Sequence, residues 1–217
     1  MNCKICIILI AILFISIISG CSDDDNPVES RKELKNYFPL SSGSSWSYHI
    51  IEVESTDTIG TFTEEIYDRN QFNSHWWYEV RGSYDYPGET YDTVAVYFHR
   101  LDYDTLYYRD DEDLYGLIAI IPTGSPDYGE ELYYEENQDD PSEYRRIIYE
   151  EMLDSLVVSN TVFYDVLVES VENHENGEIT FRDTHYWAAD IGCVLFRVEY
   201  PLEDYELVLP LKEYSLE

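Results

Sequence analysis

The chain has 217 residues, with 45 acidic residues against 13 basic ones and a formal net charge of −32 at pH 7. This excess of negative charge repels phosphate backbones and anionic lipid head groups, so we expect no nucleic-acid partner. The 22 tyrosines, 8 phenylalanines and 4 tryptophans argue against a disordered chain, because disordered sequences are poor in aromatic residues. We therefore expect a folded domain.

The first predicted element is an apolar segment, residues 5–18, which follows the basic residue Lys4. It is shorter than the roughly 20 residues of a membrane span and matches the core of a secretory signal peptide. The small residues Ser19 and Gly20 come next and precede Cys21. The pattern predicts a signal peptide over residues 1–20, cleaved between Gly20 and Cys21.

The stretch Ile18-Ser19-Gly20-Cys21 resembles the lipobox of bacterial lipoproteins. The resemblance implies that the thiol of Cys21 receives a diacylglycerol and that its new amino group is acylated, for example with palmitate. Such chains anchor a protein firmly, because each buried CH₂ group contributes about 0.8 kcal/mol. The expected membrane attachment is therefore this lipid. The alternative is an ordinary signal peptide that happens to pass a cysteine.

Three consecutive acids, Asp23, Asp24 and Asp25, follow the predicted lipid site. They resemble the acidic export signal of Bacteroidetes lipoproteins, which sends these proteins to the outer leaflet of the outer membrane. The resemblance implies display on the cell surface. A periplasm-facing anchor in the outer membrane and an anchor in the inner membrane stay open as alternatives. Residues 21–36 are predicted to be a lipidated acidic tether, and residues 37–217 a β domain.

From residue 37 onward, β-branched and aromatic residues dominate and turn residues interrupt them at short intervals, which is typical of strands. Short connections between strands predict an antiparallel meander, and a sheet of this size tends to curl. We expect a mainly all-β fold: one strongly curved sheet, half-barrel or open barrel, with at most one short helix, best placed at residues 143–156. The expected strands are residues 45–54, 60–67, 75–83, 90–101, 105–110, 114–121, 144–149, 162–171, 178–188, 193–200 and 205–214.

One hairpin of this sheet can be placed in register from the sequence. Asn176-Gly177 favours a two-residue type I′ turn, in which both residues have positive φ. Pairing outward from this turn puts Val168 opposite His185 and Val166 opposite Trp187 on one apolar face. His185 is therefore interpreted as a satisfied core histidine. Pro210 lacks an N–H group, so the last strand is predicted to be an edge strand or to be bulged there.

Three stretches together resemble a loose group of bacterial, Bacteroidetes-like lipoproteins that has no established activity. In that group the domain opens with a "YFPL..G..W.Y" pattern and closes with a hairpin before a final strand. The resemblance implies a fold and a location, and it implies no chemistry. The stretches are residues 37–48 (YFPLSSGSSWSY), 163–167 (FYDVL) and 186–194 (YWAADIGCV).

No familiar catalytic motif is present in the sequence. It has no GxSxG nucleophile elbow, no GxGxxG motif and no P-loop. Cys193 is the only cysteine after Cys21, so no disulfide is expected within the domain. The acids Asp110, Asp111 and Asp113 are candidate ligands for calcium, because calcium prefers oxygen ligands, with a solvated turn as the alternative. No other cofactor is expected.

Adjacent rings at Trp76 and Trp77 point to opposite faces of one predicted strand, so an exposed ring is a candidate contact for a glycan or protein partner. We expect a lipid-anchored envelope protein that acts as a non-enzymatic binding or scaffolding module. The alternative is a surface hydrolase that acts on polysaccharide. A cleft with converging carboxylates of perturbed pKa would favour the hydrolase, and a filled interior would favour the binding or scaffolding module.

Overall fold

The computed structural model describes residues 36–72, 74–88, 93–102, 105–109, 117–120, 131–136 and 142–217. These residues form twelve strands and no α-helix, and none of their segments is a helix long and apolar enough to cross a membrane. In chain order the strands are β1 (Ser45–Glu52), β2 (Thr58–Phe72), β3 (His75–Asp85), β4 (Thr93–Asp102), β5 (Thr105–Arg109), β6 (Leu117–Ile120), β7 (Glu131–Glu136), β8 (Glu143–Val158), β9 (Thr161–Glu175), β10 (Glu178–Ala188), β11 (Gly192–Tyr200) and β12 (Tyr205–Ser215).

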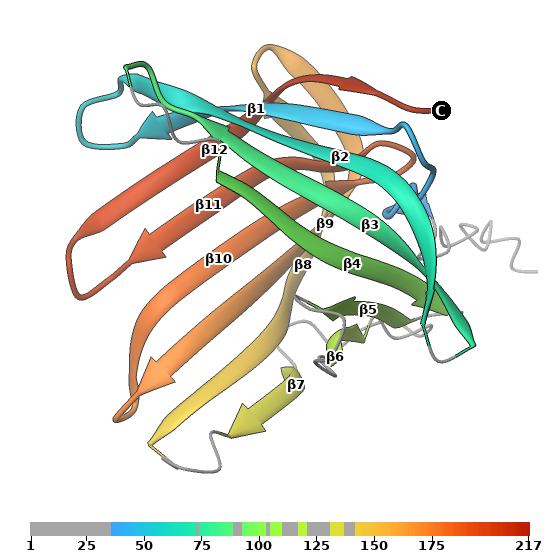
Figure 1. Cartoon of the computed structure of the whole chain (residues 1–217). Helices are drawn as coiled ribbons and strands as arrows, with labels where there is room; N and C mark the ends of the chain where they lie inside the picture. Colours follow the sequence, from blue (N-terminus) through green and yellow to red (C-terminus); the bar gives the residue numbers. More distant parts are fainter. Residues whose placement is uncertain are drawn as a thin grey trace, which may run out of the picture. The chain divides into compact units, whose positions relative to one another are not determined.

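All of these strands belong to one antiparallel sheet, in the order β6-β5-β4-β3-β2-β1-β12-β11-β10-β9-β8-β7. The sheet therefore consists of two six-stranded meanders, joined where β1 pairs with β12. It curls into a half-barrel (Figure 1), which confirms the predicted all-β fold class. A sheet of this many strands twists and curls because each strand is rotated relative to its neighbour.

The helix considered for residues 143–156 is wrong, because this segment lies within strand β8. Three consecutive residues, Ile147, Ile148 and Tyr149, are buried, since both faces of the strand are covered there. The register then shifts between Tyr149 and Glu151, and Met152 is exposed. Burial on both faces followed by a β-bulge produces an apolar spacing that resembles a helical one.

The hairpin between β9 and β10 has the predicted turn but a different register. Asn176 and Gly177 have φ values of 53° and 83°, as a type I′ turn requires. The register shifts between Ile179 and Phe181, so Thr180 is an extra residue on β10. This bulge moves every later pair by one position. His185 lies opposite Glu169 and Trp187 opposite Leu167, so the predicted pairing with Val168 and Val166 is wrong.

Strand β12 lies inside the sheet, between β1 and β11, so the prediction of an edge strand is wrong. Pro210 lies opposite Leu195 of β11. The pairing of β12 with β1 shifts register at Lys212, between Leu211 and Glu213, so the bulge of this strand lies two residues after Pro210 and not at it.

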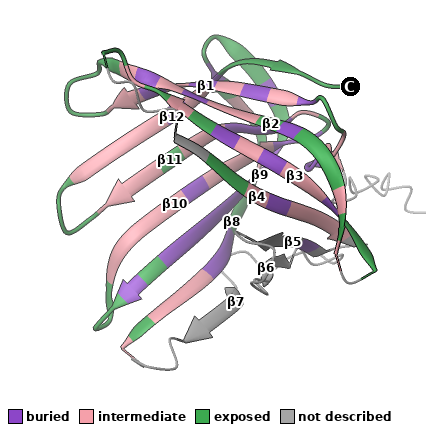
Figure 2. Cartoon of the chain, in the orientation of Figure 1, coloured by how far each residue is buried: buried purple, intermediate pink, exposed green. Residues whose placement is uncertain are grey.

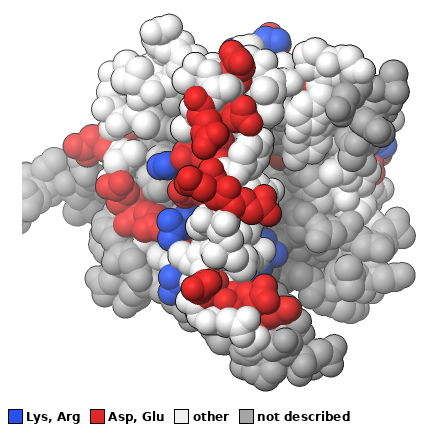
Figure 3. All heavy atoms as spheres, turned by 90° about the vertical axis from the view of Figure 1, so that its left-hand side faces the viewer, with Lys and Arg blue, Asp and Glu red and all other residues white. Residues whose placement is uncertain are grey.

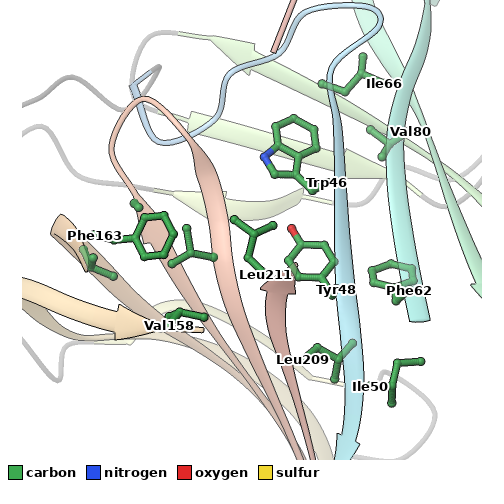
Figure 4. Packing of buried hydrophobic residues seen from close by; sticks show 13 residues of the cluster. Trp46, Tyr48, Ile50, Phe62, Ile66, Val80, Val158, Phe163, Leu209 and Leu211 are labelled. Carbon is green, nitrogen blue, oxygen red and sulfur yellow. The ribbon is translucent and has the colours of Figure 1, made fainter. Parts of the chain in front are cut away.

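The core of the half-barrel lies along the middle of its strands, and the hairpin ends are more exposed (Figure 2). Tyr48, Ile50 and Ile66 are almost fully buried in its largest cluster. In Figure 4, Tyr48 and Leu211 lie next to each other in this cluster, from the paired strands β1 and β12. Full burial of such side chains contributes roughly 1.5–3 kcal/mol each, so the junction between the two meanders is a main source of stability.

The first and last of the three stretches noted in the sequence contact each other in this core. Trp46 donates a hydrogen bond through Nε1 to the carbonyl oxygen of Ile191 at 2.6 Å, and the Tyr48 hydroxyl donates to the carbonyl oxygen of Cys193 at 3.0 Å. The rings of Phe38 and Trp187 lie 4.4 Å apart. These residues hold the opening segment against the hairpin that precedes the last strands, so their role in the fold is structural.

Candidate ligand-binding cavity

The inner face of the half-barrel contains a cavity of about 400 Å³. Residues of β1 to β4 line one side of the cavity, and residues of β8 to β12 line the other. Its volume falls in the range of about 300–1,000 Å³ that is common for small-molecule sites. Most of the wall is apolar, and it includes the aromatic residues Tyr48, Phe62, Tyr84, Tyr97, Phe181 and Phe196.

Strand alternation brings a group of charged side chains to this wall. His185 and Asp183 are two residues apart on β10, so they face the same side of the sheet. The bulge at Thr180 sets the register that places Glu169 of β9 opposite His185. Glu64 of β2 and Arg145 of β8 reach the cavity from the strands on either side.

His185 forms ion pairs with two carboxylates. Its Nε2 atom lies 3.0 Å from Oδ2 of Asp183, and its Nδ1 atom lies 3.8 Å from Oε2 of Glu169. Burial of the ring opposes its charged form, but these two carboxylates outweigh burial and raise the pKa of His185 to about 10. The imidazole is therefore protonated at neutral pH. The indole N–H of Trp187 donates to Oε2 of Glu169 at 3.0 Å and fixes that carboxylate.

Two further titratable groups of the cavity are shifted towards their neutral forms. Burial raises the pKa of Glu64, although the hydroxyl of Tyr97 donates a hydrogen bond to its carboxylate. Burial also lowers the pKa of His99 to about 4, and the positive charge of His185 adds to this effect. The cavity thus holds one charged and one neutral imidazole at neutral pH.

Two buried polar atoms of the cavity residues have no hydrogen-bond partner among the residues that the structure describes. They are Oδ1 of Asp183, whose other oxygen pairs with His185, and Nε of Arg145. A buried polar atom without a partner costs roughly 1–3 kcal/mol. Of the six such atoms among the described residues, these two share one cavity, where a bound molecule or water would complete the hydrogen bonding.

The tryptophan pair singled out in the sequence lies outside the cavity. The Trp76 side chain is 49% exposed, and the guanidinium of Arg69 lies 4.4 Å from its ring centroid. Trp77 is buried, with Arg100 at 4.8 Å from its ring. One ring of the pair therefore faces solvent, as the strand alternation predicts. Neither ring contributes to the cavity wall.

The other residues predicted from the sequence lie outside the described part of the chain. Within that part, no group of three or more His, Cys, Asp or Glu side chains is arranged to hold a metal ion. The predicted residues that lie outside the described part are those of the processing and export site, Gly20, Cys21, Asp23, Asp24 and Asp25, and the calcium candidates, Asp110, Asp111 and Asp113.

The charged groups of the cavity were not identified from the sequence as a site. The predicted register places His185 opposite Val168 in an apolar face. The available signal is Glu169, an acid that directly follows the apolar residues 166–168. An acid in a strand that is buried on both faces needs a partner, and the structure supplies it as His185 and Trp187.

The fold and cavity define the class of the protein as a single-sheet antiparallel half-barrel with an internal site. No protein-family model and no curated protein matches the chain. A crystal structure from Bacteroides fragilis, of a protein described as exported and as having a YmcC-like fold, aligns with a TM-score of 0.51 at 8% identity. The alignment covers 82% of this chain and 98% of that one. This likeness shows the fold.

A crystal structure of a protein from Parabacteroides distasonis, described as a lipoprotein, aligns with a TM-score of 0.44 at 9% identity. It covers 82% of this chain and 98% of that one.

Proposed function

We propose that the chain is a lipid-anchored protein of the cell envelope that binds a small amphipathic molecule in the cavity of its half-barrel. The observation that carries the proposal is an aromatic cavity in which Asp183 and Arg145 each bury a polar atom that has no partner among the described residues. An apolar wall with a few convergent polar groups is the usual composition of a small-molecule site.

The lipid anchor rests on the sequence and has support from the comparison. Cys21 follows an apolar segment of signal-peptide length, and the similar fold in Bacteroides fragilis belongs to a protein described as exported. The acids Asp23, Asp24 and Asp25 favour the outer face of the outer membrane, with a periplasm-facing anchor as the alternative. A cavity of this kind in the envelope could capture a nutrient or a signal molecule.

Binding is tested on the lipidated full-length protein, purified in a neutral detergent. Solvent extraction and mass spectrometry should detect a small molecule in stoichiometric amount. Val198→Trp should lose this molecule, because Val198 lines the cavity and an indole at this position fills it. Val53→Trp is the matched control, since Val53 is exposed and lies outside the cavity wall. Equal amounts on both variants, or none on the wild type, would contradict the proposal.

A surface hydrolase acting on polysaccharide is the second candidate, and Glu64 is the observation that favours it. Its raised pKa suits a general acid, and a second carboxyl group, that of Asp183, lines the same cavity 3.0 Å from Nε2 of His185. The test is the release of reducing sugars from envelope and plant polysaccharides. Activity that is lost in Glu64→Gln would establish hydrolysis, and the absence of activity in the wild type would exclude it for those substrates.

A further inference from the structure

Building on the proposed binding function, we infer that the ligand is a zwitterion with an apolar body, of the class of apolar amino acids and short apolar peptides. Its ammonium group binds the free oxygen of Asp183, and its carboxylate binds the guanidinium of Arg145. The apolar part lies against the aromatic wall between these two groups.

The Asp183 carboxylate is prepared for a positively charged donor. Its Oδ2 atom lies 3.0 Å from Nε2 of His185, and its buried Oδ1 atom accepts no hydrogen bond from the part of the chain that the structure describes. A charged donor binds a carboxylate more strongly than a neutral donor does. The rings of Phe62, Tyr84 and Phe196 in the same wall add favourable cation–π interactions. The net charge of −32 also attracts cations at long range.

Arg145 is the complementary group for an acid. Its neighbour Arg146 and the nearby Arg182 both donate to Glu172 on the other face of the sheet. Arg145 itself, which has a buried Nε in the cavity, forms no hydrogen bond or ion pair with the described residues. A guanidinium presents five N–H donors and binds carboxylates in a two-pronged geometry. A ligand carboxylate would therefore supply the missing partner.

The two free groups do not pair with each other, although they line one cavity. Arg145 lies opposite Asn173 in β9, and Asp183 lies opposite Val171, one step further along the same face. Phe181 and Val171 are apolar lining residues beside them. A simple amine would leave Arg145 without a partner, and a simple acid would leave Asp183 without one. A zwitterion with an apolar body satisfies both.

The inference is tested by calorimetric titration of the lipidated full-length protein in neutral detergent, after removal of any co-purifying molecule. Three probes are compared: the dipeptide leucyl-phenylalanine, the amine phenethylamine and the acid 3-phenylpropionate. We expect the dipeptide to bind at least tenfold more tightly than either singly charged probe. Asp183→Asn and Arg145→Gln should each reduce its affinity at least tenfold. The exposed residues Asp154 and Arg69 supply the matched controls Asp154→Asn and Arg69→Gln, which should bind like the wild type.

The two substitutions should also show which charged group of the ligand each residue binds. Asp183→Asn should weaken the binding of phenethylamine and leave the binding of 3-phenylpropionate unchanged. Arg145→Gln should weaken the binding of 3-phenylpropionate and leave the binding of phenethylamine unchanged. Circular dichroism checks that both variants are folded. Equal affinity of the dipeptide and either singly charged probe would overturn the inference, as would unchanged dipeptide binding in the folded variants. A co-purifying molecule that depends on the cavity but is not displaced by the dipeptide would overturn the zwitterion and leave the proposed binding function standing.

Discussion

Gly192 lies where the opening segment of the domain contacts the hairpin between β10 and β11. It has a φ of +106°, and a Cβ atom at this position would lie 3.1 Å from Nε1 of Trp46. Gly192→Ala should therefore lower the free energy of unfolding by about 1–3 kcal/mol. Gly177→Ala is the control, because Gly177 has a φ of +83° but open space around it. Urea denaturation should show the larger loss for Gly192→Ala; equal losses would mean that the contact with Trp46 is unimportant.

The protonated His185 predicts a loss of folding stability at alkaline pH. Its pKa is raised from 6.5 to about 10, so the folded state keeps a proton that the unfolded state loses above pH 6.5. The stability contributed by His185 is therefore complete below about pH 6.5 and is lost as pH rises towards 10. Melting temperatures between pH 6.5 and pH 9 should fall in the wild type and should fall less in His185→Gln. His75→Gln, at an exposed position, is the control and should follow the wild type.

His99 acts in the opposite direction on the acid side. Its pKa is lowered to about 4, so its contribution to stability is complete above about pH 6.5 and is lost as pH falls towards 4. The two histidines together favour greatest stability near neutral pH. Relief of repulsion among the 45 acidic residues would by itself raise stability as pH falls towards 5.5. The His99 contribution opposes such a rise.

At the scale of the strands, charged side chains form a ladder on the outer face of β8, β9 and β10. Glu172 of β9 accepts hydrogen bonds from Arg146 at 2.6 Å, from Arg182 at 2.6 Å and 2.8 Å, and pairs with His174 at 2.8 Å. Figure 3 shows acidic and basic side chains interleaved in a band on one face of the domain. Cross-strand pairs of opposite charge stabilise a sheet and fix its register.

This ladder predicts that the folded domain loses stability at acidic pH. Burial opposes the charged form of Glu172, but its bonds to His174, Arg182 and Arg146 outweigh burial and lower its pKa from 4.5 to about 2. Its contribution is present above about pH 4.5 and is lost as pH falls towards 2. Glu172→Gln should cost roughly 1–3 kcal/mol at pH 7 and should make unfolding below pH 4.5 less steep. Glu175→Gln, at an exposed position of the same strand, should do neither; equal effects would contradict the role of the ladder.

The sequence predicts eleven of the twelve described strands, misses β7 and fails at the bulges. Asn176-Gly177 forms its turn because its conformational preference is local to two residues. The bulge at Thr180 depends on how β10 packs against the curled sheet, and no residue type marks it. The bulge in β8 also cannot be predicted from residue types, and it gives this strand an apolar spacing that resembles that of a helix. Local preferences are readable from sequence, whereas the register of a curved sheet is set by packing.

The cavity could not be predicted for the same reason. A shift of one residue exchanges the two faces of a strand. The unbulged register puts Val168 opposite His185, and the actual one puts Glu169 there. Glu64 and Arg145 join the group only because the sheet curls and brings β2 and β8 to one cavity. Such a long-range arrangement leaves no spacing pattern in the sequence.

At the scale of the whole molecule, the predicted anchor and the acidic domain can be tested together. Cys21→Ala should leave the precursor unprocessed and without an acyl label, because the thiol is the predicted acceptor. Replacing Asp23, Asp24 and Asp25 with alanine should keep the acyl label but lower the cleavage of the protein by protease added to intact cells. Acylation of Cys21→Ala would contradict the lipid site, and unchanged cleavage of the triple variant would contradict the surface signal.

The pairing of β1 with β12 also determines the order of events during folding. Each meander consists of neighbours in sequence and can form early, but the ladder between them joins Ser45 to Ser215 across almost the entire domain. Contacts of such high sequence separation are slow to form. Until β12 has emerged, β1 and β11 each keep an open strand edge, which is a template for pairing with another chain. The newly made domain therefore passes through an aggregation-prone stage, in which a chaperone that covers strand edges would raise the yield of native protein.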